Sequence, residues 1–460
     1  MKKFITTLVV GMVIVSIVVV AGFQTVSAAD KKVSMWTWKL AYMPGFEAVA
    51  KAYEKQTGVK VEISPFYPDQ TYKQKVAAAM AANTLPDVLH WWGVRDPEFV
   101  EQAINMKEIF TADWQKQFYP VSLPAVTVSQ TDIDNWASDK ETAPYKKNLK
   151  AGDIAGIPLD VGGFYIFYGN KKLIAKAGLD PAKKPADFEE FVAMIKTVKE
   201  KTGVAGLTYG GKFADLWRNW AAVGHFAMAN GPEGFAKLLK RESKMSDPEN
   251  LRVLQALEML AKNGLLQPGL LNLTIDDADA AFFAGKTAFD LGGSFTMSTL
   301  IALGMNPDDV VIYALPPLRG GKYMAWKNNP FTLTMMSVMK NSPVKDDALG
   351  FVKFLCSPDG AALFASGAYT IPAVDLGAAG KGEQLPAALK PIIASFVSEP
   401  DYFNQMKAMQ GGIDKDFAIG AYQEWRVFDS GTQKIVAGTA TAAAIAADFD
   451  KAMEAEKAKK

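Results

Sequence analysis

The sequence predicts an α/β protein with two lobes, and two observations support this prediction. The chain has 460 residues, which is more than one hydrophobic core usually holds, so we expect two folding units. From residue 33 onward, short apolar runs alternate with segments in which apolar residues recur at helical spacing. Alternating strands and helices are typical of α/β lobes with a largely parallel sheet.

The N-terminus has the features of a secretory signal. Lys2 and Lys3 precede an apolar run over residues 4–22, and small residues follow near Ala28 and Ala29. We therefore expect a signal peptide over residues 1–29, cleaved after Ala28 or Ala29, and a periplasmic mature protein. A retained membrane anchor is the alternative, because the run nearly spans a bilayer. No Cys lies near this site, which excludes a lipid-anchored form.

A βαβ unit is expected directly after this segment. Residues 33–38 (VSMWTW) predict a buried strand, and residues 59–63 (VKVEI) predict a second one. A helix is expected between them, ending at Gly58, because four apolar residues recur at helical spacing. These residues are Phe46, Val49, Ala50 and Tyr53. The crossover between the two parallel strands should be right-handed.

The later segments continue the alternation. A helix over 72–82 should precede a strand over 88–92. Asp187 is expected to cap a helix that ends at Gly203, and Glu190 stands where a capping box needs an acid. The buried face of this helix should consist of Phe188, Phe191, Val192, Ile195 and Val198. Further helices are expected at 248–263, 344–356, 358–367 and 439–460, and short strands at 286–291, 310–314 and 332–339.

Composition excludes several classes of protein. The formal net charge is +1, and without Lys2 and Lys3 it becomes −1. No basic stripe occurs, so nucleic acid is not an expected partner. Cys356 is the single cysteine, so the chain forms no intramolecular disulfide, and a small buried hydrophobic role is expected for it.

Enzyme signatures are absent from the sequence. His90 and His225 are far apart, and no H-E-x-x-H, G-x-S-x-G, C-x-x-C or G-x-G-x-x-G pattern occurs. Gly285 is expected in a turn and not in a phosphate-binding loop, because Ala280 stands where such a loop needs glycine. We therefore expect no catalytic residue and no cofactor. A carboxylate pair for glycoside hydrolysis stays open, since any two acids can meet in space.

An acidic cluster at Asp276, Asp277 and Asp279 has two interpretations. Carboxylates at such spacing can bind Ca²⁺, which takes several oxygen ligands. The glycine and the downstream Glu of an EF-hand loop are missing, however. Acidic residues also favour the first turn of a helix through the helix dipole. We therefore expect a helix start and no metal site.

Indole side chains are the most distinctive candidates for a binding site. The chain has ten Trp, and a flat aromatic ring can cover the apolar face of a sugar while polar side chains bind its hydroxyl rim. Trp38-Lys39 and Trp91-Trp92 follow the first and third expected strands, and open α/β sheets bind ligands at the carboxyl ends of their strands. For any single Trp, a role in core packing remains the alternative.

Several motifs then occur in a fixed order along the chain. They are GIPLD at 156–160, FYGNK at 167–171, AGL at 177–179, DFEEF at 187–191 and AFFAGKTAFDLGGSF at 281–295. This order resembles the extracellular solute-binding proteins that supply ABC importers, in particular the sugar-binding branch related to maltose-binding protein. The chain departs from the family pattern at Gly169, which precedes Asn170, and at Phe188 and Phe295, where Trp is usual.

The resemblance implies a fold like that of the type II periplasmic binding proteins, with two α/β lobes joined by a multi-crossing hinge. The implied crossings lie near 160–164, 331–334 and 372–376. The first lobe would then comprise residues 30–162 plus 333–373, and the second lobe residues 163–332 plus 374–460. Glycine, asparagine and proline residues make these crossings compatible with loops.

The ligand site implied by the resemblance is an aromatic sandwich built from both lobes. The residues that we expect to contact the ligand are Trp38, Lys39, Trp91, Trp92, Asp160, Trp217, Phe295, Trp326, Asn328 and Trp425. Asp160 is included because it follows Pro158 as the family's acid does. Trp425 is included because the family often has a stacking residue late in the chain.

The function implied by the resemblance is capture of a sugar or oligosaccharide and its delivery to the membrane subunits of an ABC permease. We expect a monomer without a catalytic step. Alternatives are a binding protein for a phosphorylated polyol, a polyamine or a peptide, an anchored sensor, and a secreted carbohydrate-active enzyme. A phosphate ligand would need several Arg, Lys or helix N-termini, whereas a polyamine would need acids together with aromatic rings.

Overall fold

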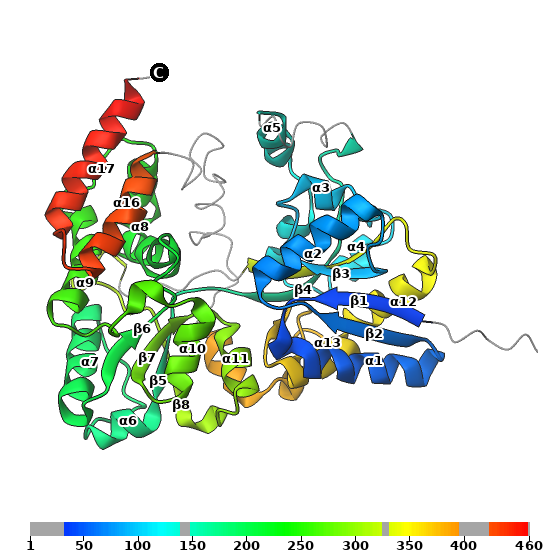
Figure 1. The fold of residues 1–460 in the computed structure, drawn as a ribbon, viewed down its shortest axis with the longest axis horizontal. Helices are drawn as coiled ribbons and strands as arrows, with labels where there is room; N and C mark the ends of the chain where they lie inside the picture. Colours follow the sequence, from blue (N-terminus) through cyan, green and yellow to red (C-terminus); the bar gives the residue numbers. More distant parts are fainter. Residues whose placement is uncertain (1–31, 139–147, 324–330, 395–422, 459–460) are drawn as a thin grey trace, which may run out of the picture.

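The computed structural model describes residues 32–138, 148–323, 331–394 and 423–458. Two sheets lie side by side and define two lobes (Figure 1). The six-stranded sheet, in the order β10-β4-β9-β3-β1-β2, forms the first lobe, and the four-stranded sheet, in the order β6-β7-β5-β8, forms the second lobe. The expected signal peptide and the candidates Trp326 and Asn328 lie outside the described residues.

The first lobe contains the N-terminal elements together with several segments from later in the chain. Its strands are β1 (Lys32–Thr37), β2 (Lys60–Pro65), β3 (Val88–Trp91), β4 (Ile157–Gly162), β9 (Phe331–Val338) and β10 (Ile371–Pro372). Its helices are the 3-10 helix η1 (Leu40–Tyr42), α1 (Met43–Thr57), α2 (Asp69–Ala82), α3 (Pro97–Val100), α4 (Ala112–Gln115), α5 (Gln130–Ser138), α12 (Lys345–Leu355) and α13 (Pro358–Ala368). α14 (Lys390–Ala394) contacts β8 (Val310–Ala314) of the second lobe. Short 3-10 turns occur at Pro120–Ser122, Pro124–Val126, Gly382–Gln384 and Ala387–Leu389.

The second lobe is built mainly from the middle of the chain and its C-terminal helices. Its strands are β5 (Ile166–Asn170), β6 (Ala205–Thr208), β7 (Thr287–Gly292) and β8 (Val310–Ala314). Its helices are α6 (Lys171–Lys176), α7 (Phe188–Thr202), a π-helix (Arg218–Ala222), α8 (Val223–Leu239), α9 (Pro248–Lys262), α10 (Ile275–Phe283), α11 (Thr296–Ala302), α16 (Gln423–Val436) and α17 (Ala442–Lys457), with 3-10 turns at Leu270–Asn272 and Pro307–Asp309.

The expected βαβ unit is confirmed. β1 and β2 pair in parallel, and α1 ends at Gly58, whose φ of 73° is left-handed and suits glycine. The expectation of a largely parallel sheet is wrong, however. β9 pairs antiparallel with both β3 and β4, and β5 pairs antiparallel with β7 and β8. The antiparallel strands come from chain segments that pass between the lobes, which local periodicity does not reveal.

Two expected helix starts are confirmed by their hydrogen bonds. The Asp187 side chain accepts a hydrogen bond from the Glu190 backbone N–H (2.8 Å), and Arg319 in turn pairs with Asp187, which lowers the pKa of this carboxyl. The acidic cluster begins α10, where Thr274 and Asp277 form a capping box. Gly285 follows α10 with a φ of 68°, as expected for a turn.

The residues directly after the boundary expected at residue 374 contact the first lobe. The Asp375 N–H donates to the Gln117 carbonyl (2.8 Å), and Lys381 forms a salt bridge with Asp359 of α13 (2.7 Å). Both partners belong to the first lobe, so the chain stays in the first lobe after β10. The sequence offered no signal for this, because residues 377–386 are rich in Gly, Ala and charged residues. The expected lobe boundaries remain proposals.

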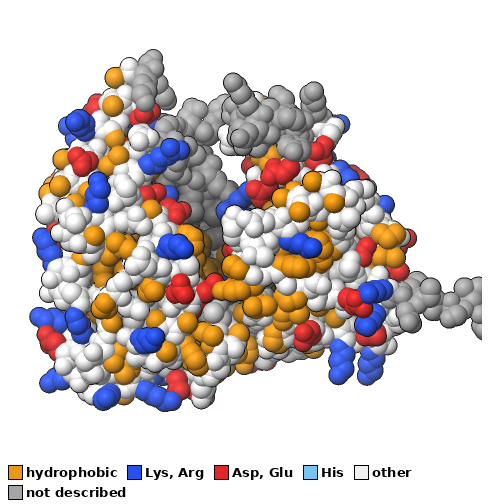
Figure 2. Space-filling model, viewed as in Figure 1, with side chains coloured by type: hydrophobic (Ala, Val, Ile, Leu, Met, Phe, Trp, Pro, Cys, Tyr) orange, Lys and Arg blue, Asp and Glu red, His pale blue; other side chains and the backbone are white. Residues whose placement is uncertain are grey.

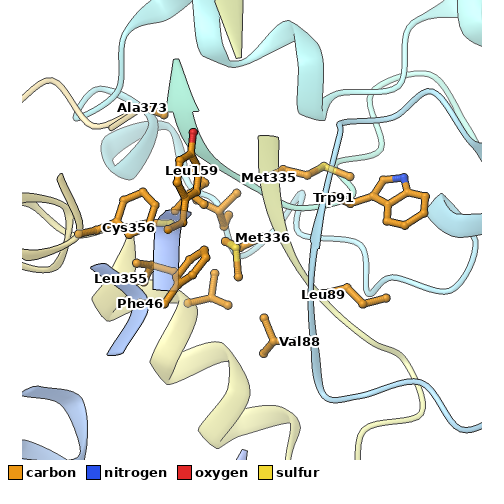
Figure 3. Close-up of a cluster of buried hydrophobic side chains, with 14 of the residues drawn as sticks. Phe46, Val88, Leu89, Trp91, Leu159, Met335, Met336, Leu355, Cys356 and Ala373 are labelled. Carbon is orange, nitrogen blue, oxygen red and sulfur yellow. The ribbon is translucent and has the colours of Figure 1, made fainter. Parts of the chain in front are cut away.

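The core of the first lobe surrounds its central strands (Figure 3). Met335 and Met336 of β9 point to opposite faces of the sheet, as adjacent strand residues must. Phe46 and Cys356 lie on the face that Met336 occupies, and Trp91 lies toward the other face. Cys356 is buried, and burial raises the pKa of its thiol, which supports the expected packing role.

No single helix within the described ranges is long and apolar enough to span a membrane. α12 and α13 meet the criterion only together, and they are bent by 71° relative to each other.

Candidate functional site

The space between the two lobes is the candidate site, and Figure 2 shows that this face of the molecule is hollowed there. β4 leads from the first lobe to the second through Gly162 and Gly163. The Gly163 N–H donates to Ser294 Oγ (3.2 Å), and the Ser294 N–H donates to the Gly163 carbonyl (2.9 Å). A Cβ atom on Gly162 would lie 1.8 Å from Ser294 Oγ, so this crossing requires glycine.

Three aromatic rings of the second lobe form one cluster beside this crossing. Phe164 stacks on Trp220, with ring centroids 5.0 Å apart and an interplanar angle of 17°. Phe295 meets the edge of Trp220 at 5.8 Å and that of Phe164 at 6.4 Å. Phe164 and Phe295 are only partly buried. Trp220 belongs to the π-helix, a rare conformation that often occurs at functional sites. We call Phe164, Trp220 and Phe295 the aromatic triad.

The first lobe contributes a second aromatic group at the carboxyl ends of β1 and β3. Trp92 is partly buried and packs on Trp38, with centroids 3.8 Å apart. Lys73 Nζ lies 4.9 Å from the Trp92 ring centroid, within the range of a cation–π interaction. Trp38 is only 1% exposed and stacks on His90 at 4.3 Å. Of these two rings, Trp92 is the more exposed, and Trp38 packs behind it.

Three contacts connect the lobes across this space. Lys39 Nζ lies 4.5 Å from the ring centroid of Phe295, so a first-lobe cation covers one ring of the triad. The Tyr67 hydroxyl donates to Asp276 Oδ2 at 2.6 Å, and Asp276 stands in the first turn of α10. In addition, Ser298 of α11 donates to the Tyr369 carbonyl (3.0 Å). α10 and α11 thus form the side of the second lobe that faces the first (Figure 1).

Asp160 occupies a different environment from the one expected. It is fully buried, and it accepts hydrogen bonds from the hydroxyls of Tyr42 (2.6 Å), Thr370 (3.2 Å) and Thr334. Burial raises the pKa of this carboxyl, whereas the hydrogen bonds from Thr334 and Tyr42 lower it. Three hydroxyls therefore use its acceptor capacity, which favours a structural role for Asp160 in holding β4 against β9, η1 and the segment between α13 and β10.

Three other candidates lie in the cores of the lobes. Trp91 stacks on Phe99 at 4.4 Å, and its indole N–H donates to Asp96. Trp217 is 1% exposed and neighbours Tyr209. Trp425 of α16 is 2% exposed and contacts Phe428 and Phe449 at 5.6 and 5.1 Å. Their packing favours structural roles. Of the expected residues, the structure brings Lys39 and Phe295 together, whereas Trp92 packs on Trp38 within the first lobe.

Phe164 and Trp220 are the site residues that sequence reasoning missed. Phe164 directly follows the glycine pair of the crossing, and an aromatic residue in such a loop was a usable signal. Trp220 and Trp217 stand three residues apart in one segment. Only the tertiary structure shows that Trp220 packs with Phe164 and Phe295, whereas Trp217 neighbours Tyr209 in the core. The sequence offered no signal that distinguishes them.

The chemistry of this site is that of recognition. Within the described ranges, no group of three or more His, Cys, Asp or Glu side chains could hold a metal ion. His90 and His225 are fully buried, and burial lowers the pKa of both imidazoles, so both are neutral near pH 7. Aromatic faces with ammonium and carboxylate groups around them can bind an apolar face and a polar rim together.

Two known binding proteins are similar in sequence to this chain. A melibiose/raffinose/stachyose-binding protein, MelE of Bacillus subtilis, is 23% identical over 330 residues, which are 68% of this chain and 67% of that protein. An sn-glycerol-3-phosphate-binding periplasmic protein, UgpB of Salmonella paratyphi A, is 24% identical over 235 residues. This second match covers 48% of this chain and about half (49%) of that relative's length.

Solved structures share the fold at low sequence identity. A structure from a study of xylan utilisation by Caldanaerobius polysaccharolyticus has a TM-score of 0.67 and 21% identity, covering 91% of this chain and 99% of that chain. A maltose-bound protein of T. maritima has a TM-score of 0.65 and 19% identity, covering 92% and 99%. The model of the bacterial extracellular solute-binding protein family matches residues 37–362. This chain therefore belongs to the bacterial extracellular solute-binding proteins.

Proposed function

We propose that this chain is the solute-binding component of an ABC importer and that its two lobes close on a sugar or oligosaccharide. The observation that carries the proposal is the pair of partly exposed aromatic surfaces on opposite lobes. Trp92 belongs to the first lobe and the aromatic triad to the second, so one sugar can meet a ring from each side. Lys39 lies over Phe295 and Lys73 over Trp92, and Asp276 meets Tyr67 between the lobes. These charged groups offer partners for hydroxyl groups.

The named ligands of relatives support the same chemistry. MelE is described as binding melibiose, raffinose and stachyose, and a structurally similar protein holds maltose. The ligand binds the closed arrangement more tightly than the open one, and no covalent bond is made or broken. The alternative function is that of a carbohydrate-active enzyme, which would hydrolyse a chromogenic glycoside. We expect no hydrolysis by the purified protein.

A phosphorylated polyol is the second candidate ligand, and one observation favours it. Lys39 and Lys73 lie on the two aromatic surfaces, and neither forms an ion pair within 4.0 Å among the described residues. Two ammonium groups in one cleft can bind a phosphate. The relative UgpB is named for sn-glycerol 3-phosphate.

A thermal-shift screen distinguishes these candidates. The probes are melibiose, raffinose, stachyose, maltose, xylo- and chito-oligosaccharides, sn-glycerol 3-phosphate and spermidine. A ligand that binds only the folded state stabilises it by about 2.7 kcal/mol at one hundred times its Kd, so we expect a higher unfolding temperature with at least one neutral oligosaccharide. A shift with sn-glycerol 3-phosphate alone would establish the second candidate, and a shift with spermidine alone would contradict both.

We further propose that the mature protein works outside the cytoplasm as a monomer that meets the permease subunits when loaded. The membership of an extracellular family supports this location, and the sequence of residues 1–29 supports export. Intact-mass measurement of the periplasmic fraction should give a chain that begins at Ala29 or Asp30. The full precursor mass in the membrane fraction would instead indicate a retained anchor.

A further inference from the structure

A hydrogen bond between Tyr67 and Asp276 joins the two lobes. The Tyr67 hydroxyl donates to Asp276 Oδ2 at 2.6 Å, a distance typical of a hydroxyl bound to a charged carboxylate. Such a bond is stronger than one between neutral groups. Burial and the bond to Asp276 raise the pKa of Tyr67, so its hydroxyl keeps the proton that it donates at neutral pH.

Each partner of this bond is fixed within its own lobe. Tyr67 follows β2, and the N–H of its neighbour Phe66 donates to the carbonyl of Thr37 at the end of β1 (2.8 Å). Asp276 stands in the first turn of α10, and a capping box holds that turn in place. The bond therefore forms between two ordered segments, and only the side chains lose freedom when it forms.

A second group of contacts joins the lobes at α11, and we call it the seam. α11 contacts η1 of the first lobe, and the Ser298 hydroxyl donates to the Tyr369 carbonyl (3.0 Å). Met297 of α11 and Phe282 of α10 belong to the apolar cluster that forms the core of the first lobe. Phe282 follows Asp276 by six residues, about 9 Å along the helix axis. The seam and the Tyr67–Asp276 bond thus lie at opposite ends of α10.

We propose that the Tyr67–Asp276 hydrogen bond is a latch that holds the two lobes together before a ligand binds. The side chains of the seam are apolar, so their exposure to water on opening is unfavourable. A hydroxyl and a carboxylate, in contrast, exchange their mutual bond for bonds to water when they separate. The lobes therefore open by pivoting near the seam, and this movement breaks the latch. The proposal goes beyond the proposed function, because it concerns the ligand-free protein.

The latch determines how many ligand-free molecules are closed. An intramolecular hydrogen bond that is exchanged for bonds to water changes an equilibrium about threefold to tenfold. Tyr67→Phe removes the hydroxyl and keeps the ring. We therefore expect this variant to lower the ratio of closed to open molecules by about threefold to tenfold.

Single-molecule energy transfer on the ligand-free protein measures this ratio. Dyes on Asp134→Cys of α5 and Lys434→Cys of α16 report on opposite lobes, since both positions are exposed and Cys356 is buried. α5 and α16 lie on either side of the hollow between the lobes (Figure 1), so opening should lengthen the distance between the dyes.

A double-mutant cycle tests whether the two side chains act through one bond. Tyr67→Phe and Asp276→Ala should each lower the closed-to-open ratio. The double variant should match Asp276→Ala alone, because either change already breaks the same bond. Effects that multiply in the double variant would show that the two residues act separately, and they would overturn the proposal.

Tyr53→Phe is the matched control. The Tyr53 hydroxyl donates to the Asp347 carbonyl (3.2 Å) within the first lobe, so its removal should leave the closed-to-open ratio of the parent unchanged. A ratio unchanged by Tyr67→Phe, or lowered equally by Tyr53→Phe, would overturn the latch.

Ligand affinity gives a second measurement, which rests on the proposed function. For a ligand that binds only closed molecules, the apparent Kd is inversely proportional to the closed fraction. In Tyr67→Phe, the Kd of the oligosaccharide that the thermal-shift screen identifies should rise by the factor by which the closed fraction falls. A lower Kd in this variant would show that the bond opposes closure, and it would overturn the latch. If no oligosaccharide binds, the proposed function fails, while energy transfer still decides the latch.

Discussion

Replacing Asp160 with alanine should destabilise the protein by about 3 kcal/mol, although no ligand contact is lost. The carboxylate is fully buried and accepts hydrogen bonds from Tyr42, Thr334 and Thr370. Tyr42 and Thr370 can still bond to each other, since their oxygens are 3.1 Å apart, but Thr334 loses the one acceptor found for its side chain. Denaturant unfolding at pH 7 measures the effect as a lower midpoint.

Two variants make this prediction specific. Asp160→Asn keeps an acceptor oxygen and nearly the same volume, so it should cost about 1 kcal/mol. Asp134→Ala removes an exposed acid whose side chain, among the described residues, accepts a hydrogen bond from Gln130, and it should change stability by less than about 0.5 kcal/mol. If Asp160→Ala unfolds like the parent but loses ligand affinity, Asp160 is a ligand contact after all, as the sequence suggested.

Replacing Trp220 with alanine should weaken ligand binding by about 1–3 kcal/mol, which is roughly fivefold to somewhat more than a hundredfold in Kd. Trp220 is the centre of the triad, because Phe164 stacks on it and Phe295 meets its edge. Its removal takes away ring surface and the support for both neighbours. Phe295→Ala should have a similar effect through its own face. Calorimetric titration with the sugar identified by the thermal-shift screen measures both.

Core and surface variants separate binding from folding in this experiment. Phe283→Ala removes an aromatic side chain that is 38% exposed at the far end of α10, so affinity should stay within twofold or so of the parent. Trp425→Ala should mainly lower stability, by about 3–5 kcal/mol, because Trp425 is packed in the second core. If Trp425→Ala folds normally and loses binding while Trp220→Ala binds as tightly as the parent, the site is assigned to the wrong rings.

Local patterns allowed most elements of the fold to be predicted. Apolar spacing from Phe46 to Tyr53 and the glycine at position 58 located α1, and β7 and β8 followed from short apolar runs. The direction of strand pairing could not be predicted in the same way. β9 enters the first sheet from a distant part of the chain and runs antiparallel to β3, and nothing local in the residues 331–338 encodes its partner.

The candidate site was predictable only where position along a strand decides exposure. Lys39 and Trp92 follow the carboxyl ends of β1 and β3, where ligands of open sheets bind, and both lie at the cleft. Trp217, Trp220 and Trp425 all sit in helical segments rich in apolar residues. Which of these indoles faces the cleft depends on how the helices pack, and sequence alone does not contain that information in readable form.

A crystal structure of the complex with the identified sugar tests the central claim most directly. We expect electron density for a sugar between the lobes. One face of the sugar should lie on Trp92 and another on Phe295 or Trp220. The Lys39 ammonium should have moved from the Phe295 ring or be bonded to a sugar hydroxyl. The second lobe also carries a surface groove of about 360 Å³ beside Gln267, Leu270 and Val436. A sugar bound in that groove, with the aromatic triad unoccupied, would contradict the account.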